Sequence, residues 1–297
     1  MIIPLESVTA AQVANRLVQV REEGGVVALG RVMTLIIMAG PGLVEDAITL
    51  SNNASRAHPA RVIVIEVCRD DAADGLDAQI RVGADAGASE VVVLRPRGQA
   101  GEELDTLITP LLLPDAPIVA LWLGLTPSDP ASSLVGKMAQ RRITDAVDAG
   151  VPALRELAAH YQPGDTDLSW ARITLWRALL AAQFDQPLPE PRSVTITGNS
   201  ERPATQLLAG WLRDRLGVPV EIEPIDAVEL RAVRVDFDGD HLLIEREPGS
   251  WTAVISRPSG LDQSTPLAVR TIADCLMEDL RRLDADPTYA RALATVR

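Results

Sequence analysis

The amino-acid sequence predicts an α/β protein made of two layered α/β domains, each a mixed sheet covered by helices, joined through a central helix. Three observations predict this fold class. Strand-like and helix-like segments alternate along the 297 residues with short connections. Apolar runs such as residues 61–67 are rich in β-branched side chains, as in strands buried on both faces. The Gln-Pro-Gly segment at residues 162–164 is the strongest boundary signal, so we expect domains at residues 1–161 and 162–297.

The first domain opens with a helix and continues with alternating strands and helices. Thr9 is a good N-cap, and a helix over residues 9–23 places Val13, Leu17 and Val20 inward. The Gly-Pro-Gly segment at residues 40–42 closes the strand region that follows. The same signals predict strands at residues 26–38, 61–67, 77–82, 90–94 and 117–123, and helices at residues 45–56, 102–112 and 151–161.

The central helix is expected to begin at a cap, Asp165 or Thr166, and to end near Phe184, with Asp167 complementing the helix dipole. At about 100° per residue its apolar side chains form two stripes on nearly opposite faces. One stripe holds Leu168, Ala171, Leu175, Leu179 and Ala182, and the other holds Trp170, Ile173, Trp176, Leu180 and Phe184. We favour a helix covered on both sides within the fold over one that offers a side to a partner.

The second domain combines helices with a predicted hairpin. Residues 233–237 and 241–246 alternate about an Asp-Gly turn, which is a strong hairpin signal. Thr265 and Pro266 are expected to open a long helix that carries Val269 and Leu283 on its apolar face, and Asp286 and Pro287 a last short one. Further strands are predicted at residues 193–197, 218–223 and 251–256, with a helix at residues 203–216.

The composition limits the partners and the compartment. Lys and Arg total 28 against 41 Asp and Glu, a formal net charge of −13, which argues against nucleic acid and anionic membranes as partners. No basic n-region begins the chain, and the longest apolar run, residues 32–44, is shorter than the ~20 residues of a membrane span. Cys68 and Cys275 are too few for a disulfide scaffold and are expected to be inert thiols. We therefore expect a cytoplasmic protein.

Sequence motifs for catalysis or cofactor binding are absent. His58, His160 and His241 are scattered, and H-E-x-x-H, C-x-x-C, G-x-S-x-G and G-x-G-x-x-G do not occur. The turn at residues 83–87 contains two glycines, but a predicted strand follows it, so the helix N-terminus of a phosphate site is missing. The sequence predicts no catalytic residue, no metal site and no cofactor.

Two segments, residues 140–145 and 164–172, are dense in mixed polar side chains. Their arginines, together with Arg177, either pair with nearby aspartates and hold the two domains together, or face an acidic ligand or partner. The sequence leaves both interpretations open. The residues concerned are Arg141, Arg142, Arg172, Arg177, Asp145, Asp165 and Asp167.

Eight strings in collinear order, spread over nearly the full length, carry a family resemblance. They are REEGGVVALGRVMTL (21–35), NASRAHPARV (53–62), LDAQIRVGADAGASEVVVL (76–94), PLLLPDAP (110–117), AQRRITD (139–145), YQPGDTDLSWARITLWRALL (161–180), LRRLD (280–284) and YARAL (289–293). On these residues the chain resembles the OpcA family, the glucose-6-phosphate dehydrogenase assembly proteins of bacteria.

The resemblance implies a non-catalytic assembly and activation factor. It would bind glucose-6-phosphate dehydrogenase, favour the active oligomer of that enzyme and support the oxidative pentose phosphate pathway. Such a protein acts by preferring the active state of its partner, so it needs a shaped surface and no reactive group. Trp and Arg are enriched at interface hot spots. The partner-binding candidates are Arg81, Trp122, Arg141, Arg142, Asp145, Asp165, Asp167, Trp170 and Arg172.

An alternative class is an α/β sugar-phosphate or nucleotide-binding regulatory protein. This alternative requires a pocket with converging arginines, for which Arg81, Arg141 and Arg142 are the candidates. An unrecognised enzyme is a third class, and the lack of catalytic motifs disfavours it.

Overall fold

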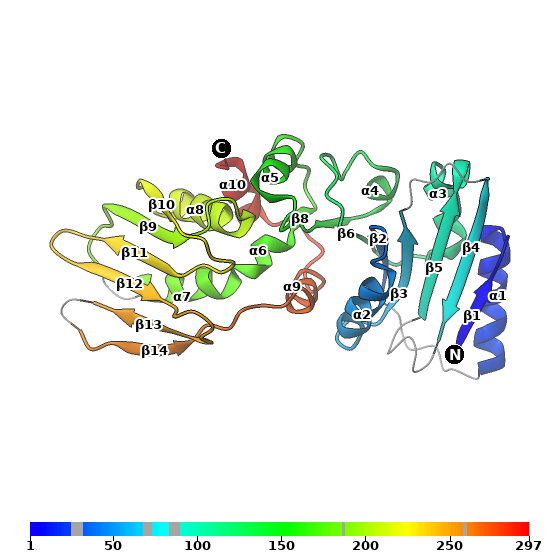
Figure 1. Cartoon of the computed structure of the whole chain (residues 1–297), viewed down its shortest axis with the longest axis horizontal. Helices are drawn as coiled ribbons and strands as arrows, with labels where there is room; N and C mark the ends of the chain where they lie inside the picture. The colour runs from blue at the N-terminus through cyan, green and yellow to red at the C-terminus, as the bar shows by residue number, and fades with distance from the viewer. Residues whose placement is uncertain (25–31, 68–72, 83–89, 186–187, 258–259, 297) are drawn as a thin grey trace. The chain divides into compact units, whose positions relative to one another are not determined.

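The computed structural model describes residues 1–24, 32–67, 73–82, 90–185, 188–257 and 260–296. Its contacts divide the chain into two compact units, and the chain returns to the first unit twice (Figure 1). The first unit comprises Met1–Asp145, Gly164–Thr166 and Ile272–Ala285. The second comprises Ala146–Pro163, Asp167–Thr271 and Asp286–Arg297. Each unit contains one sheet, as the sequence predicts.

The first unit has an eight-stranded mixed sheet in the order β1-β4-β5-β3-β2-β6-β7-β8. Strands β5, β3, β2, β6 and β7 run parallel, and β4 and β1 extend the sheet antiparallel. The strands are β1 (Ile2–Leu5), β2 (Met33–Ala39), β3 (Ala60–Glu66), β4 (Gly75–Arg81), β5 (Glu90–Arg97), β6 (Ile118–Leu123), β7 (Arg141–Thr144) and β8 (Asp165–Asp167). In chain order the parallel strands read 3-2-1-4-5, which is the order of doubly wound dinucleotide-binding domains.

Helices cover both faces of this sheet. Alternate side chains such as Ile36 and Ile63 pack against α1 (Ala10–Gly24), α3 (Leu104–Ile108) and α4 (Leu134–Met138). The other face carries α2 (Val44–Ser55), against which α9 (Ile272–Asp279) packs. Two short 3₁₀ helices, η2 (Gly98–Gly101) and η3 (Thr109–Leu111), flank α3. Strands β2 and β3 are buried at almost every position, as their unbroken apolar runs predict.

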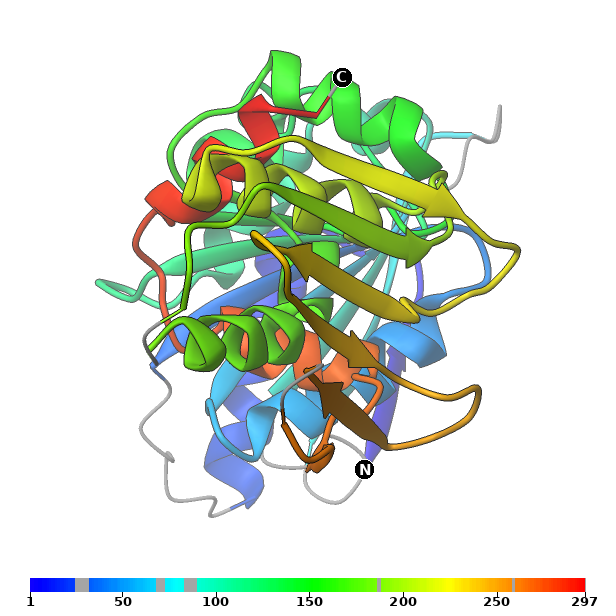
Figure 2. The ribbon, with the colours of Figure 1, turned by 90° about the vertical axis from the view of Figure 1, so that its left-hand side faces the viewer.

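The second unit has a six-stranded sheet in the order β10-β9-β11-β12-β13-β14. Only the β10–β9 pair is parallel among its described pairings. Figure 2 shows strands of this sheet side by side. Their bounds are β9 (Ser193–Gly198), β10 (Val220–Pro224), β11 (Ala232–Asp236), β12 (His241–Glu245), β13 (Thr252–Ser256) and β14 (Gln263–Pro266). The Asp-Gly hairpin between β11 and β12 confirms the sequence prediction.

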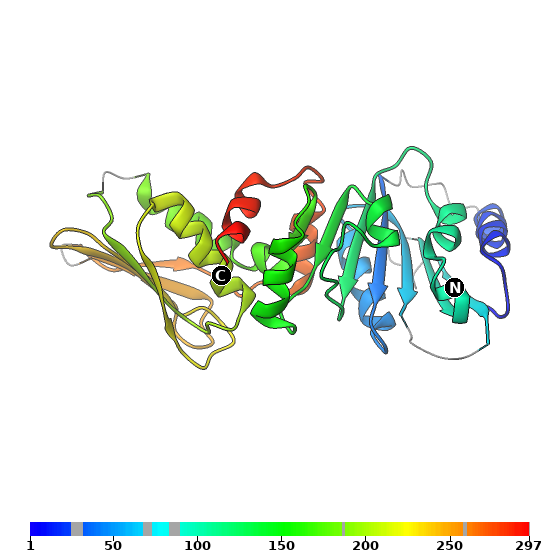
Figure 3. The same ribbon diagram turned by 90° about the horizontal axis from the view of Figure 1, so that it is seen from above.

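One face of the second sheet packs on helices. Val194, Ile196 and Ile244 point into a core shared with Leu207 and Trp211 of α8, which lies along the sheet in Figure 3. Helix α8 crosses α10 closely, since a Cβ on Gly210 would lie 2.4 Å from the Ala292 carbonyl oxygen. The helices are α5 (Gly150–Ala159), α6 (Leu168–Arg172), α7 (Thr174–Phe184), α8 (Pro203–Leu216) and α10 (Pro287–Ala294). Contacts place α5 in this unit, although it precedes residue 161 and was expected in the first domain.

The prediction of one continuous helix from Asp165 to Phe184 is wrong. Residues 165–167 form β8 at the edge of the first sheet, Asp167 caps α6, and Ile173 separates α6 from α7. The stripe with Trp170, Ile173, Trp176 and Leu180 is buried, but Leu175 and Ala182 of the other stripe are exposed. Within the described part of the chain, α7 is therefore covered on one side, not on both as favoured.

The prediction of a helix that starts at Thr265 is also wrong. Residues 263–266 form the edge strand β14, which pairs with β13, and α9 begins only at Ile272. An edge strand tolerates Pro266 because an edge position does not require its missing N–H. Strands β1, β7 and β8 were not predicted, since they are short and lack an alternating apolar pattern.

Candidate functional site

The order of the parallel strands in the first unit reverses between β2 and β6, where doubly wound proteins bind ligands. The turn from β2 into α2 is tied to β6, because the Gly40 N–H donates to the Leu123 carbonyl oxygen at 2.9 Å. Gly124, just after β6, has a left-handed φ of 69°, and a Cβ there would lie 2.2 Å from Leu43 Cδ1. The Leu43 side chain therefore fills the space above Gly124.

The charge of this turn also disfavours a phosphate. The first turn of α2 carries Glu45 and Asp46, and Glu45 lies where the dinucleotide fingerprint has its third glycine. Arg81 Nη1 donates to Glu45 Oε2 at 2.9 Å, and this hydrogen bond is the main reason why the pKa of Glu45 is below its ordinary value. Two carboxylates thus occupy the helix end that would otherwise attract a phosphate.

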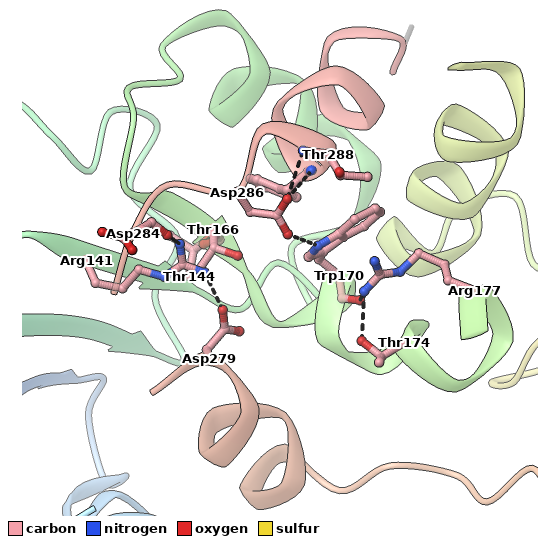
Figure 4. Close-up of polar contacts among 11 residues, drawn as sticks. Arg141, Thr144, Thr166, Trp170, Thr174, Arg177, Asp279, Asp284, Asp286 and Thr288 are labelled. Atoms are coloured by element: carbon pink, nitrogen blue, oxygen red, sulfur yellow. Dashed lines mark hydrogen bonds and ion pairs between the residues drawn. The ribbon is translucent and has the colours of Figure 1, made fainter. Parts of the chain in front are cut away.

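The candidate arginines of the first unit are paired with carboxylates. Arg141 Nη2 lies 2.5 Å from Asp279 Oδ1, and Arg141 Nη1 donates to the Asp284 carbonyl oxygen at 3.1 Å (Figure 4). Arg142 Nε lies 2.5 Å from Asp165 Oδ1. Of the two interpretations left open by the sequence, Arg142 shows the pairing with an aspartate, whereas the partner of Arg141 on α9 was not predicted.

The remaining candidates of this unit lie in its interior. Trp122 belongs to the core between the sheet and helices α1, α3 and α4. Asp145 is buried, and its carbonyl oxygen accepts a hydrogen bond from Thr126 Oγ1 at 3.3 Å. Arg81, Arg141 and Arg142 each bind a different carboxylate, so they do not converge as the alternative hypothesis requires.

In the second unit, Trp170 is the centre of a polar and aromatic cluster. Its indole Nε1–H donates to Asp286 Oδ2 at 2.9 Å, and the Arg177 guanidinium carbon lies 3.6 Å from the centre of its ring (Figure 4). Tyr289 packs against the same ring. Asp286 also caps α10 by accepting the N–H groups of Thr288 and Tyr289. This cluster joins α6, α7 and α10.

The pKa of Asp286 reflects these contacts. Burial acts to raise the pKa of this carboxyl, but the hydrogen bonds from Trp170 and from the α10 backbone, with the charge of Arg177, lower it more. The pKa of Asp286 therefore lies below its usual value. Asp167 has a similar structural task, since its side chain accepts the N–H groups of Ala146 and Ser169.

Arg172 is the candidate that lines a cavity. This cavity of about 230 Å³ lies within the second unit, and four arginines line it. They are Arg172, Arg202, Arg246 and Arg270. Arg202, Arg246 and Arg270 were not predicted as site residues, because they lie on separate elements far apart in the chain and no spacing links them.

Trp251 is a further candidate that no sequence pattern indicated. Of the five tryptophans, four are buried, whereas the Trp251 side chain is 75% exposed. Its turn is held by hydrogen bonds of Ser250 Oγ with the Thr252 N–H and Thr252 Oγ1, and the Trp251 carbonyl oxygen accepts the Leu267 N–H at 2.8 Å. A fixed backbone thus presents a large apolar side chain to solvent.

Other candidate chemistries gain no support. Among the residues that the structure describes, no three His, Cys, Asp or Glu side chains are arranged to hold a metal ion. The Cys275 thiol is buried in α9. Cys68 and the turn at residues 83–87 lie outside the described residues. No helix in the described segments has the length and apolar character needed to cross a membrane.

The fold defines a class: a two-domain α/β protein with a doubly wound N-terminal sheet and a largely antiparallel C-terminal one. Two family models match the chain consecutively. The model of the glucose-6-phosphate dehydrogenase subunit N-terminal domain matches residues 51–159, and that of its C-terminal domain matches residues 163–293. The chain therefore belongs to the OpcA family, as its sequence strings indicate, and has an assembly role associated with glucose-6-phosphate dehydrogenase. The boundary expected after residue 161 lies between the two matches.

Solved structures with a similar fold are oxidoreductases. A mutant of KijD10, a 3-ketoreductase from Actinomadura kijaniata solved with TDP-benzene and NADP, is 11% identical with a TM-score of 0.50, over 89% of this chain and 96% of that one. An aldose-aldose oxidoreductase from Caulobacter crescentus is 9% identical with a TM-score of 0.48, over 88% and 94%. At these identities the likeness concerns the fold alone. No curated protein sequence matches the chain.

Proposed function

We propose that this protein is a non-catalytic assembly and activation factor, which binds glucose-6-phosphate dehydrogenase and favours its active oligomer. The observation that carries the proposal is the consecutive match of both family domains. A binding protein raises the activity of an enzyme when it binds the active state more tightly than the inactive one. The proposed setting is the oxidative pentose phosphate pathway in the bacterial cytoplasm.

The contacts at the strand switch point of the first unit support a role without catalysis. Leu43 lies against Gly124 where a doubly wound oxidoreductase holds its dinucleotide. Glu45 adds a negative charge at the end of α2 that would meet the pyrophosphate. Both features favour a doubly wound domain that does not bind a dinucleotide cofactor.

Trp251 is our proposed anchor for the contact with the dehydrogenase. Tryptophan is enriched at interface hot spots. The hydrogen-bonded turn that carries the exposed Trp251 side chain reduces the conformational entropy lost on binding. Most of the nine sequence candidates are buried, among them Trp122, Arg141 and Trp170. We propose that such residues support the contact surface from the interior of the protein. Arg172 instead lines the cavity of the second unit.

Enzyme kinetics with the cognate dehydrogenase test the activation. We expect dehydrogenase activity to rise saturably as the chain is added, together with a shift of the dehydrogenase to a larger species in mass photometry. If the chain and the dehydrogenase co-migrate but neither the activity nor the oligomeric state of the dehydrogenase changes, the two proteins associate and the proposed activation is overturned. No binding at micromolar concentrations would overturn the whole proposal.

The Trp251→Ala variant tests the anchor. Loss of a hot-spot tryptophan is expected to weaken binding by about 2 kcal/mol or more, roughly thirtyfold. Val18→Ala is the matched control, since Val18 on α1 is also an exposed apolar residue at 50%. If Trp251→Ala and Val18→Ala both bind the dehydrogenase as tightly as the unchanged chain does, Trp251 is not part of the interface.

A further inference from the structure

The arginine-lined cavity of the second unit has the composition of an anion site. Beside the four arginines, Glu229 is the one carboxylate among its lining residues. This excess of positive charge lies in a chain whose formal net charge is −13. The location is therefore unlike the rest of the protein, and a negatively charged ligand is the complement that it lacks.

The backbone fixes two of these arginines in place. Arg246 donates from Nη1 to the Leu267 carbonyl oxygen at 3.2 Å and from Nη2 to the Leu230 carbonyl oxygen at 3.1 Å. Arg202 Nη1 donates to the Val147 carbonyl oxygen at 3.3 Å. Carbonyl oxygens orient a guanidinium but do not neutralise it; Arg246 also has the Glu229 carboxylate, 3.2 Å from its Nη2, as a counter-charge.

Burial makes the Arg246 charge costly without a partner. Desolvation lowers the pKa of its guanidinium; the Glu229 carboxylate, 3.2 Å away, acts in the opposite direction, and Arg231 lowers the pKa further. Glu229 is itself partly exposed, so it compensates only in part. A bound anion would stabilise the charged form of the Arg246 guanidinium.

Two buried polar atoms of the cavity lining have no hydrogen-bond partner within the described structure. They are Ser169 Oγ and Arg246 Nε. Ser169 is 1% exposed, and the Arg246 side chain is 4% exposed. Because buried polar groups are nearly always satisfied, a hydroxyl and a guanidinium N–H without partners indicate a missing ligand atom.

The N-terminus of α8 completes the polar side of the cavity. Residues 202–205 line the cavity, and no side chain caps this 14-residue helix. Pro203 at its start has no N–H, and the Thr205 N–H donates to the Arg202 carbonyl oxygen at 3.0 Å. The Ala204 N–H and the helix dipole are therefore what favour an anion here. Helix end, arginines and unpartnered groups thus belong to one cavity.

The other side of the cavity is apolar, formed by Ile173, Trp176, Leu230 and Val269. Its volume of about 230 Å³ is below the ~300–1,000 Å³ of sites for drug-sized ligands, so a ligand smaller than a dinucleotide fits it best. We propose that this cavity binds a small organic phosphomonoester, the phosphate held by Arg202, Arg246, Ser169 and the α8 N-terminus, and the organic part lying against Trp176.

Calorimetry and thermal unfolding of the full chain, without the dehydrogenase, test this proposal independently of the proposed function. The probes are glucose 6-phosphate, inorganic phosphate, succinate and glucose. We expect saturable binding and a raised Tm with glucose 6-phosphate, binding at least tenfold weaker with inorganic phosphate, and no response to glucose. Equal affinity for the two phosphates would overturn an organic ligand, and tighter binding of succinate would overturn a phosphate.

Two variants locate the site. Ser169→Ala removes the unpartnered hydroxyl with little change in volume, and Arg202→Gln removes one charge. Each is expected to weaken glucose 6-phosphate binding at least tenfold while circular dichroism stays unchanged. Arg192→Gln is the control, because Arg192 is exposed and pairs with Asp238 outside the cavity lining. Unchanged affinity in Ser169→Ala and Arg202→Gln would overturn the assignment even if the phosphate binds.

Discussion

The two units use arginine in opposite ways. In the first unit, buried arginines bind carboxylates, as in the pairs Arg61–Glu90 and Arg142–Asp165. In the second, Arg202 and Arg246 of the cavity lining donate to backbone carbonyl oxygens, and Arg246 has in addition the partly exposed carboxylate of Glu229. The first arrangement neutralises charge and stabilises the fold, whereas we propose that the second orients charge for a ligand. A buried arginine therefore indicates a binding site only where its protein partners do not neutralise it fully, as with Arg246 beside the partly exposed Glu229.

The largest effect is expected where this pairing is tightest. Glu90, whose side chain is 2% exposed, accepts hydrogen bonds from Arg61 at 3.0 Å and from Arg21 at 2.6 Å. Glu90→Gln leaves the Arg61 charge buried without its anion, and we expect a loss of about 3–5 kcal/mol in the unfolding free energy. Hydrogen exchange of amides in β3 and β5 measures this loss for the first unit.

Glu23→Gln on α1 is the matched acid-to-amide control. Its ion pair with Arg16 is mostly exposed, so the change is expected to be below about 0.5 kcal/mol. If both variants lose equally little, the carboxylate pairs of the first unit do not stabilise it, and the contrast between the two units disappears.

A smaller effect is expected at Asp286, where a carboxylate of the second unit binds an indole and a helix end. Since its folded-state pKa is lowered, its stabilisation is present above the unfolded-state pKa of ~3.9 and is lost as pH falls through the folded value. Asp286→Asn should cost about 1 kcal/mol near pH 7 and flatten the loss of stability below pH 4. Urea unfolding between pH 7 and pH 3 measures both, and identical pH profiles would contradict the prediction.

Arg202 tests the other half of the comparison. Its described hydrogen bond goes to one carbonyl oxygen at 3.3 Å, so Arg202→Gln is expected to cost about 1 kcal/mol or less in stability. Urea unfolding of the free chain measures this value. A loss as large as that of Glu90→Gln would mean that Arg202 is structural, and would break the distinction between the units.

The smallest effect on stability is expected for Trp251→Ala. The side chain is 75% exposed and its turn is held by backbone and hydroxyl groups, so the unfolding free energy should change by less than about 0.5 kcal/mol. The Tm of the isolated chain measures this. A clear destabilisation would show that Trp251 packs within the second unit and is not available to a partner.

Local signals explain where the sequence predictions were confirmed. Helix α8 begins at Pro203 and ends before Gly217, which adopts a left-handed φ of 66°, as predicted for residues 203–216. Asp286 caps α10 as expected. In each case the residues that define the element lie within a few positions of it, so tertiary contacts had little to change.

The wrong predictions have a common physical cause. Thr265 and Pro266 are compatible with both a helix start and an edge strand, and pairing with β13 decided for the strand. Residues 165–167 were expected to cap a helix, but the pairing of Arg142 with Asp165 holds them beside β7. Distant partners that no local pattern reveals decided both segments.

The sequence by itself determined the α/β class, the hairpin, the best-capped helices and the family. Each follows from periodicity, capping or long collinear strings, and these signals depend only on neighbouring residues and on their order along the chain. Only the tertiary structure decided which arginines are neutralised and which surround a cavity. Arg172, Arg202, Arg246 and Arg270 come from separate elements, and only the packing of a sheet against helices brings their charges to one place.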